Sequence, residues 1–363
     1  MTPRVAIVGA GMAGASLAAE IAGEAQVLLL EGEDQPGYHS TGRSAAFWAE
    51  TYGGPLVQPL TTASGPFLEA HGLLRPRGAL HIARSGDEGP LAAMEAEFGV
   101  SVDMHRLTGS EVAARIPGLR QDWLHGLSEP TCADIDVAAL HQLYLAAARR
   151  ARATLHVRAR LEEAERGQGG WSLRTSAGRF EADILVNAAG AWADPVARIA
   201  GASEIGIQPY RRTIAQLRID PPAPADLPLV IDAQERFYFK PEAGGRLWLS
   251  PHDETPCDPC DSAPEEIDVA TAIDRLEQVV DWRIERVERS WAGLRSFAPD
   301  RLPVYGFAPD RPDFFWFAGQ GGFGIQTAPA AAKLAAALLL GRKPGPMAAA
   351  IDPAPYAPGR FRN

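Results

Sequence analysis

The stretch Val5-Ala6-Ile7-Val8-Gly9-Ala10-Gly11-Met12-Ala13-Gly14 decides the fold of this chain. Four apolar residues run directly into the pattern G-x-G-x-x-G, and an alanine-rich segment follows at residues 15–22. A second apolar run, residues 26–30, ends on Glu31. This order of strand, glycine turn, helix, strand and acidic residue is typical of a dinucleotide-binding unit.

Each motif residue has a physical role in this interpretation. Gly9 permits the tight turn, Gly11 lets the backbone approach a pyrophosphate, and Gly14 lets the helix pack on the strand. The free N–H groups and the dipole at the helix N-terminus hold phosphate charge. Glu31 stands where an acid accepts hydrogen bonds from ribose hydroxyls. The motif alone leaves FAD and NAD open, and in a chain with 36 glycines a turn without a ligand is the alternative.

The composition predicts an ordinary globular protein. A length of 363 residues, with 46% hydrophobic and 22% charged residues, allows one large domain or two medium ones. The net charge of −10 argues against a nucleic-acid-binding face, which must be basic. With three cysteines and no leader before the first strand, we expect a cytoplasmic protein. The longest apolar run, residues 328–340, is shorter than the ~20 residues of a membrane span.

A second apolar strand far along the chain favours FAD over NAD. Residues 182–190 form an apolar run that ends on small residues and Gly190. An FAD domain commonly threads out to a substrate domain and returns to add such a strand. Between the two, helical spacing predicts a helix at residues 136–152. Strands are predicted at residues 78–83, 205–220 and 237–250, the last bent by a hairpin turn at Gly244-Gly245, and a helix at residues 267–280.

A second glycine-rich turn closes the pattern. Residues 319–324 lie between an apolar strand at residues 314–318 and a helix at residues 327–340. A helix N-terminus aimed at a flavin ring stabilises negative charge on the ring during reduction. The alternative is a tight turn without a ligand.

These segments resemble the D-amino-acid oxidase superfamily of FAD-dependent flavoproteins, and within it the bacterial D-arginine dehydrogenases. The likeness covers nearly the whole chain, and its most specific pieces are residues 36–46, 133–136, 185–192, 291–297 and 321–327. It implies an α/β fold with a discontinuous, Rossmann-like FAD-binding domain and an α+β substrate domain with an antiparallel sheet. We expect residues 1–50, 151–203 and 298–363 in the FAD-binding domain, and residues 51–150 and 204–297 in the substrate domain.

The resemblance also implies the chemistry. An amino acid is oxidised to its imino acid by hydride transfer to flavin N5, and the imino acid hydrolyses to a 2-oxo acid and ammonia. FAD is expected to bind non-covalently. Besides Gly9, Gly11, Gly14 and Glu31, the expected cofactor-binding residues are Met12, Ala13, Gly32, His39, Ser40, Arg43, Ser44, Ala45, Ala46, Ala159, Ala189, Gly190, Trp192, Arg295, Gly321, Gly322, Phe323, Gly324, Ile325, Gln326 and Thr327.

Four residues are expected to act on the substrate. A carboxylate is held best by bidentate arginine, and the resemblance gives this role to Arg212 and Arg295. Arg211 should point to the opposite face if its strand alternates. Tyr238 matches a family tyrosine that hydrogen-bonds the carboxylate, and Tyr52 matches one on a mobile loop over the site. The alternatives are a surface ion pair for either arginine and a core position for either tyrosine.

The expected substrate pocket departs from that of the arginine enzymes. Ala79 stands where they have a glutamate that pairs the guanidinium, and Phe47 and Trp48 replace a histidine and a tyrosine; Gly322 completes the pocket. A cationic side chain loses its buried partner here. We therefore expect a neutral or hydrophobic D-amino acid rather than D-arginine, unless Glu50 or His81 supplies a polar contact.

The remaining polar residues carry weaker signals. His39 is expected on the cofactor side, and His81, His141 and His252 are expected to be structural or surface residues. Cys257 and Cys260 form one C-x-x-C pair, which without a second pair indicates a loop with two free thiols, far from the flavin, rather than a metal site.

Other functions stay open within and beyond the superfamily. Within it, the substrate could be glycine, an N-methylated amino acid such as sarcosine, or a 2-hydroxy acid. Outside that chemistry, the chain could be a flavin-containing modification or assembly protein without a small amino-acid substrate. The sequence leaves the electron acceptor open among dioxygen, a quinone and others, and it leaves the oligomeric state open.

Overall fold

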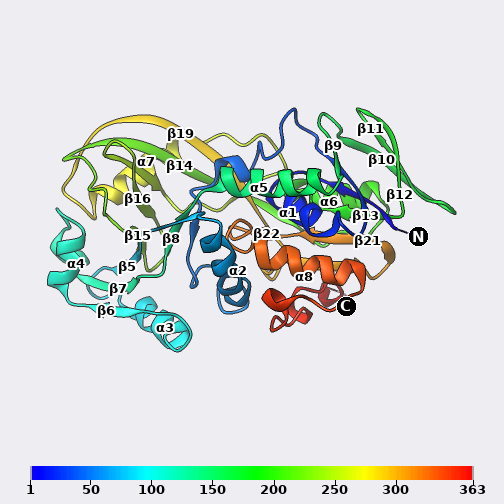
Figure 1. Ribbon diagram of the computed structural model, residues 1–363. Helices are drawn as coiled ribbons and strands as arrows, with labels where there is room; N and C mark the ends of the chain where they lie inside the picture. The colour runs from blue at the N-terminus through cyan, green and yellow to red at the C-terminus, as the bar shows by residue number, and fades with distance from the viewer. Residues whose placement is uncertain (1, 362–363) are drawn as a thin grey trace.

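The computed structural model describes residues 2–361, which form two parts, each built on its own large sheet (Figure 1). In the first part, six strands lie in the order β20-β21-β13-β1-β2-β9. All neighbours run parallel except β20 and β21, which are antiparallel. The strands are β1 (Arg4–Val8), β2 (Gln26–Leu30), β9 (Thr154–His156), β13 (Ile184–Asn187), β20 (Val304–Ala308) and β21 (Arg311–Ala318).

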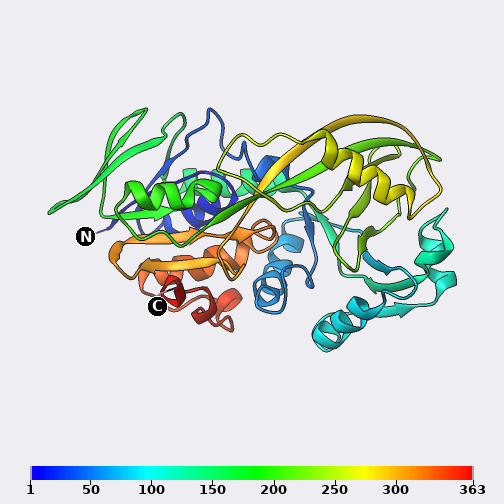
Figure 2. The ribbon, with the colours of Figure 1, turned by 180° about the vertical axis from the view of Figure 1, so that it is seen from behind.

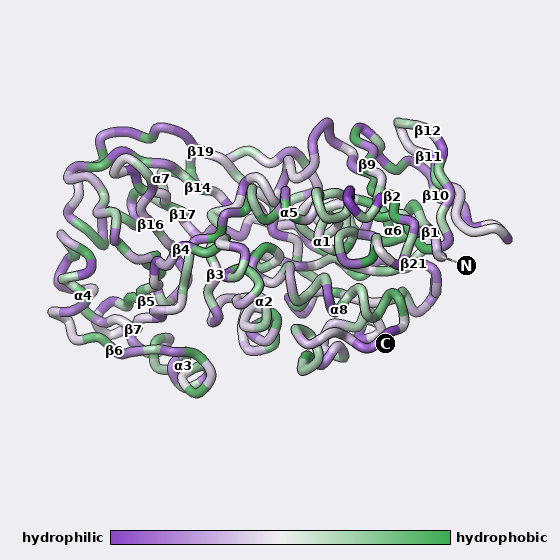
Figure 3. The backbone as a smooth tube through the Cα atoms, viewed as in Figure 1, coloured by the Kyte–Doolittle hydropathy of each residue, from purple (hydrophilic) through white to green (hydrophobic). Residues whose placement is uncertain are grey.

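Both faces of this sheet are covered, as a parallel sheet requires. One face packs against α1 (Met12–Ile21), α5 (Val137–Arg150) and α8 (Ala328–Leu340). The other face packs against α6 (Ala193–Ile199) and a small antiparallel sheet of β10 (Leu161–Gly167), β11 (Gly170–Thr175) and β12 (Gly178–Ala182). Figure 3 shows hydrophobic residues along β21 and α8, in the interior of this part.

The second part is a ten-stranded sheet in which every pair is antiparallel except β15 with β5. Its path is β22 (Gln320–Gly321), β19 (Arg283–Phe297), β14 (Gln208–Asp220), β17 (Arg246–Ser250), β16 (Tyr238–Glu242), β15 (Leu229–Asp232), β5 (Ala79–Ala83), β7 (His125–Glu129) and β6 (His105–Leu107), with β18 (Thr255–Pro256) beside β14. The helices α3 (Gly89–Phe98), α4 (Gly109–Arg115) and α7 (Glu266–Glu277) pack on it.

Smaller elements join the two parts. The helix α2 (Gln58–Ala70) packs against α8 of the first part, and a three-stranded sheet of β3 (Phe47–Trp48), β8 (Ala133–Ile135) and β4 (Leu74–Pro76) lies near it (Figure 1). The long strands β14 and β19 run from the far end of the second part to the first (Figure 2). The end of β19 pairs with β22, which follows β21 directly in the chain, so the two large sheets meet there.

The predicted α/β fold class is confirmed. The apolar run before Gly190 returns as β13 and pairs with β1, as an FAD domain requires. The predicted hairpin forms from β16 and β17, with both Gly244 and Gly245 at positive φ. The helix α2 was not predicted, because its proline and several small polar residues obscure the apolar spacing. The domain ranges stay a prediction.

The glycine turn and α1 are in direct contact. A Cβ atom on Gly14 would lie 1.8 Å from the carbonyl oxygen of Gly9, inside any allowed van der Waals distance. Only glycine therefore lets α1 start this close to β1, and this closeness sets where the N-terminus of α1 points.

We expect Gly14→Ala to lower the free energy of unfolding by about 1–3 kcal/mol, because the added methyl overpacks the turn. FAD should also be lost during purification. The matched control is Gly23→Ala, since Gly23 is exposed and an added Cβ meets nothing within 4 Å; its effect should stay within about 0.5 kcal/mol. Urea unfolding and the flavin-to-protein absorbance ratio measure both variants, and equal behaviour contradicts the expectation.

Candidate active site

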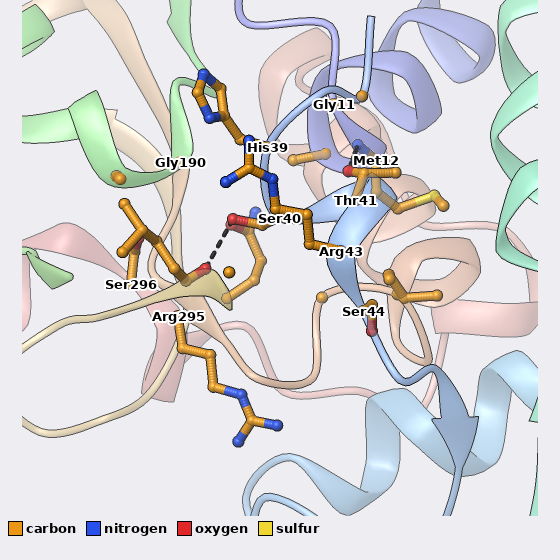
Figure 4. A pocket seen from close by; sticks show the side chains of 18 of the residues that line it. Gly11, Met12, His39, Ser40, Thr41, Arg43, Ser44, Gly190, Arg295 and Ser296 are labelled. Atoms are coloured by element: carbon orange, nitrogen blue, oxygen red, sulfur yellow. Dashed lines mark hydrogen bonds between the residues drawn. The ribbon is translucent and has the colours of Figure 1, made fainter. Parts of the chain in front are cut away.

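One cavity runs from the glycine turn of the first part to the inner face of the ten-stranded sheet. Figure 4 shows Gly11 and Met12 at one end of it, and the guanidinium of Arg295 pointing toward the other. The sequence-predicted residues that line it are Gly9, Gly11, Met12, Ala13, Glu31, His39, Ser40, Arg43, Ser44, Ala45, Ala189, Gly190, Trp192, Arg212, Tyr238, Arg295, Gly321, Gly322, Gly324 and Ile325. The structure thus brings together residues from both ends of the chain.

The end of the cavity at the glycine turn fits the dinucleotide half of FAD. The carboxylate of Glu31 is fixed by hydrogen bonds from the backbone N–H groups of Ala10 (2.9 Å) and Glu33 (3.0 Å). Its position beside the turn suits hydrogen bonds to ribose hydroxyls. The hydroxyl of Thr41 accepts a hydrogen bond from the N–H of Met12 (3.0 Å), so the loop after β2 reaches the N-terminus of α1.

Several of the predicted cofactor-binding residues do not line the cavity but lie behind its wall. These residues are Gly14, Gly32, Ala46, Ala159, Phe323, Gln326 and Thr327. The Ala159 N–H donates to the carbonyl of Glu31 (2.7 Å) and so supports that residue from behind. The Gln326 side chain is buried and bonds to the backbone of Ala49 and of Tyr52 (3.1 and 3.0 Å). Family motifs span such supporting residues as well as contacts, so a motif match does not separate the two.

Other lining residues were missed. They are Gly37, Tyr38, Thr41, Ala188, Ala191, Ile214, Gly293, Leu294, Ser296 and Gln320. Most of them are next to a predicted residue in the sequence. Extending each motif segment by one or two residues would therefore have found them. Ile214 could have been found from strand alternation, since it lies two residues after Arg212.

The loop that lines the middle of the cavity is tied to the second part. The Ser40 hydroxyl donates to the carbonyl of Leu294 (2.7 Å), the bond drawn in Figure 4. The guanidinium of Arg43 donates to the carbonyl of Ser262 (2.7 Å) and pairs with Asp261. Asp261 and Ser262 directly follow Cys260. The sequence analysis placed the C-x-x-C loop far from the flavin, but in the structure this loop binds Arg43, which lines the cofactor cavity.

Both predicted arginines lie on one face of the β14–β19 pair. In this register Arg212 is opposite Gly293, and Arg295 is two residues further along β19, so the two guanidiniums are diagonal neighbours. Arg211 points to the other face as predicted, where it pairs with Glu265 and Asp268. Alternation along the strand therefore separates the two adjacent arginines.

Several donors at this end have no partner among residues 2–361. Arg212 donates from Nε to the carbonyl of Asp253 (2.7 Å) and from Nη2 to Glu254 (3.2 Å), but its buried Nη1 has no hydrogen bond. The buried hydroxyl of Tyr238 also has none. The guanidinium of Arg295 forms no hydrogen bond or ion pair in the described chain and lies 5.7 Å from the ring centroid of Tyr52. Buried donors of this kind are normally satisfied, so they point to a missing acceptor.

The electrostatics favour an anion there. Burial and the nearby positive charge of Arg295 lower the pKa of Arg212 to about 10, so both guanidiniums are charged at neutral pH. Burial acts against the charge on Arg295 too, but Tyr52 and Tyr238 outweigh it and raise the pKa of that guanidinium. Burial also raises the pKa of the Tyr52 phenol, which stays a hydrogen-bond donor. A carboxylate would accept from these groups and relieve the repulsion of the arginines.

A buried acid that the sequence analysis missed positions Tyr52. Glu129 is fully buried at the end of β7 and accepts hydrogen bonds from the N–H of Glu50 (2.7 Å) and the hydroxyl of Thr51 (2.7 Å). His81 lies 3.5 Å from its other side. Burial opposes the charge on Glu129, but the adjacent His81 ring and the hydrogen bonds from Thr51 and Glu50 outweigh it and lower its pKa. The contact joins residues far apart in the chain, so no sequence motif indicated it.

The predicted side-chain pocket is partly corrected. The ring of Phe47 faces the site, with its centroid 5.3 Å from that of Tyr52 and 6.1 Å from that of Tyr238. Trp48 is the next residue on β3 and therefore points the other way, where its Nε1 donates to the carbonyl of Thr61 (2.9 Å). Ala79 is buried in the cluster that contains Tyr238. None of these three side chains lines the open cavity.

Gly322 lies between Tyr52 and Arg295, and only the absence of a side chain there leaves room for both. A Cβ atom there would lie 2.2 Å from the Tyr52 hydroxyl and 3.0 Å from Nη1 of Arg295. Of the two residues considered for a compensating polar contact, Glu50 accepts from Thr62 (2.6 Å) and His81 faces Glu129, and neither lines the cavity.

The histidines divide into different environments. His39 lines the cavity and lies 3.0 Å from Glu33, and His141 is structural, since its Nε2 bonds the carbonyl of Ala10 (2.9 Å). His252 is corrected from a structural or surface residue to a neighbour of the site, because its ring centroid is 5.7 Å from that of Tyr238. Burial and then the charges of Arg212 and Arg295 lower the pKa of His252 to about 2, so this ring is neutral.

Fold and cavity together define a flavoprotein of the dinucleotide-binding class. A family model described as "FAD dependent oxidoreductase" matches residues 4–338. The chain belongs to this family, the D-amino-acid oxidase superfamily, and FAD is its cofactor. It is an FAD-dependent oxidoreductase. The glycine turn, the fixed Glu31 and the second glycine-rich turn are the residues that would hold the cofactor.

The relatives include glycine oxidases. Glycine oxidase from Pseudomonas aeruginosa is 28% identical over 391 residues, which cover 99% of each chain. Glycine oxidase from Geobacillus kaustophilus is 26% identical over 97% of this chain and 96% of the relative, and its crystal structure matches with a TM-score of 0.86 over 100% of both chains. L-proline dehydrogenase from P. horikoshii matches with a TM-score of 0.84 at 21% identity, over 99% and 98% of the two chains.

Residues 2–361 contain neither a membrane-spanning helix nor a metal-binding cluster. No helix there is long and apolar enough to cross a membrane. No group of three or more histidine, cysteine or acidic side chains in that range is placed to hold a metal ion.

Arg212→Met should abolish binding of a small carboxylate such as acetate. In the parent protein, acetate should raise the melting temperature of the FAD-loaded form, since a ligand that binds only the folded state stabilises it. The variant should lose this shift, and its melting temperature and FAD content without acetate, measured alongside, show that it is folded and loaded. Arg211→Met is the matched control on the opposite face and should keep the acetate shift. A variant at position 212 that still responds to acetate contradicts the assignment.

Proposed function

We propose that this chain oxidises a small, neutral amino acid, with glycine and small D-amino acids as the substrate class. The product is the imino acid, which hydrolyses to a 2-oxo acid and ammonia. FAD, when bound, supplies the acceptor for the hydride. The observation that carries the proposal is the set of unpartnered donors at the sheet end of the cavity, Arg212 Nη1, the Tyr238 hydroxyl and the guanidinium of Arg295.

The donors suit an α-amino carboxylate. Arg212 and Arg295 offer N–H groups that can donate to both carboxylate oxygens, while Tyr238 can donate a further hydrogen bond. Holding the carboxylate fixes the direction of the substrate Cα–H bond and so contributes the orientation that the reaction requires. The two positive charges also favour the neutral amine over the ammonium form, and oxidation needs the neutral form.

The surroundings support a substrate with a small neutral side chain. Phe47 packs against both tyrosines and so limits the room beside them. Trp48 points away, and among residues 2–361 no acidic side chain lines the cavity near the arginines to pair a cationic substrate. This supports the neutral preference predicted from sequence, but favours small substrates over large hydrophobic ones. The glycine oxidases among the relatives are in keeping with this size; the D configuration rests on the sequence resemblance.

The proposal is tested with a substrate panel of glycine, sarcosine, both enantiomers of alanine, and D-leucine, D-phenylalanine and D-arginine. We expect the largest kcat/KM for glycine or D-alanine, and at least about a tenfold lower value for D-arginine, which corresponds to about 1.4 kcal/mol. Ammonia release separates amine oxidation from oxidation of a 2-hydroxy acid, which gives none. A higher kcat/KM for D-arginine than for every neutral substrate contradicts the proposal, as does a flavin that no amino acid bleaches.

Glu129→Gln should reduce the reaction through Tyr52. The amide keeps one acceptor for the backbone but loses the charge that the hydrogen bonds of Thr51 and Glu50 stabilise, at a cost of about 1.5–3 kcal/mol for a charged bond. We expect a larger rise in KM than fall in kcat, because the loop that carries Tyr52 loosens, while FAD content is unchanged. Glu88→Gln is a suitable control, since Glu88 is half-exposed and distant in the second part. An unchanged KM in the Glu129 variant argues against the positioning role.

A further inference from the structure

A second cavity, of about 530 Å³, lies on the other side of the loop that lines the FAD cavity. Ser44, Ala45 and Ala46 form one of its walls. The opposite wall is formed by Lys240 and Trp248, on the hairpin of β16 and β17. Its volume is in the range of small-molecule sites, and nothing in the proposed reaction uses it.

Only a thin partition separates the two cavities. Ser44 and Ala45 line both of them. The partition is held in an uncommon backbone conformation, since Ala46 has a φ of 35°. The N–H of Ala46 donates to the Ser44 hydroxyl (3.0 Å), and its carbonyl accepts from the N–H of Ile135 (3.2 Å). Strain of this kind is concentrated at functional sites, where the surrounding structure holds it in place.

The far wall combines an aromatic ring with a buried cation. Lys240 is only 5% exposed, and its ammonium donates to Asp134 (2.6 Å). That is its single hydrogen bond among residues 2–361, although an ammonium has three N–H donors. The ammonium also lies 5.0 Å from the ring centroid of Trp248. Arg77 shares Asp134 (2.6 Å) and stands at the mouth of the cavity.

We propose that this second cavity binds the electron acceptor, and that the acceptor is a planar molecule of the quinone class. The inference rests on the proposed function. Oxidation of the amino acid to the imino acid releases two electrons and two protons, and a quinone that takes up both leaves as the quinol. The small side chains of the partition let such a molecule come close to the cofactor site without entering the substrate cavity, where the product is still bound.

The lining selects a quinone over other acceptors. Dioxygen needs no cavity of this size. A quinone ring can pack on the indole of Trp248, and the N–H donors of Lys240 can reach a quinone carbonyl. The charged residues in the lining balance, with Arg75, Arg77 and Lys240 against Asp134, Asp136 and Glu242, so a neutral ligand is favoured over a strongly charged one.

The test blocks the mouth of the cavity and follows the electron acceptor alone. Ala225 and Ala243 are exposed and line this cavity but not the FAD cavity. The double variant Ala225→Trp/Ala243→Trp is compared with Ala177→Trp, the same change in an exposed turn that lines neither cavity. Each FAD-loaded protein is reduced with stoichiometric dithionite under anaerobic conditions and mixed with menadione or with dioxygen, and flavin absorbance reports reoxidation.

We expect reoxidation by menadione to slow at least tenfold in the double variant, with dioxygen reoxidation and melting temperature close to the parent values. Equilibrium dialysis of menadione with the oxidised protein should show binding that the double variant loses and Ala177→Trp keeps. Reoxidation by menadione within twofold of the parent overturns the proposal, and so does an equal loss with dioxygen, which indicates a damaged FAD site. Because dithionite replaces the amino acid, the result does not depend on the proposed substrate; a failed substrate shows separately, as a flavin that amino acids do not bleach.

Discussion

The repulsion between two guanidinium groups is the constraint around which the active site is built. Arg212 and Arg295 are held as diagonal neighbours by the register of β14 and β19, the longest strand pair in the molecule. Without an anion, this arrangement is unfavourable, since one arginine depresses the pKa of the other. A bound carboxylate converts the repulsion into binding energy. The repulsion between Arg212 and Arg295 is unfavourable by itself. The strand pairing of β14 with β19 nevertheless holds the two arginines in place.

The two parts of the molecule form different ends of the cavity. The parallel sheet and the glycine turn form the dinucleotide end of the cavity, and the antiparallel sheet carries the two arginines proposed to bind the carboxylate. The loop at residues 38–46 joins them, because Ser40 and Arg43 bond across to the second part. This loop also separates the FAD cavity from the second cavity. Substrate, cofactor and acceptor are thus placed around one short segment of chain.

The sequence was sufficient for the fold, and the structure brings the predicted Arg212, Tyr238 and Arg295 together in one cavity. Local patterns explain this success, since the glycine motif, the returning strand and strand alternation each depend on neighbours in the chain. Alternation predicted that Arg211 and Arg212 point to opposite faces. The same rule, applied to β3, separates Phe47 from Trp48. Strand alternation could therefore have shown that these two side chains do not face the same pocket.

What the sequence did not predict comes from contacts between distant segments. Glu129 reaches the residues before Tyr52, and His252 lies beside Tyr238, through the tertiary fold alone. The loop of Cys257 and Cys260 lies near Arg43 for the same reason. Such contacts leave no periodic signal, and a family motif does not distinguish a residue in the cavity wall from one that supports it.

The most direct test of the paired-arginine account is a crystal structure of the FAD-loaded protein with acetate. The account predicts an acetate whose oxygens lie within about 3 Å of Nη1 of Arg212 and of an N–H group of Arg295. The Tyr238 hydroxyl should donate to the same ligand. Acetate bound elsewhere, or two arginines satisfied by protein groups in the loaded enzyme, would contradict the account.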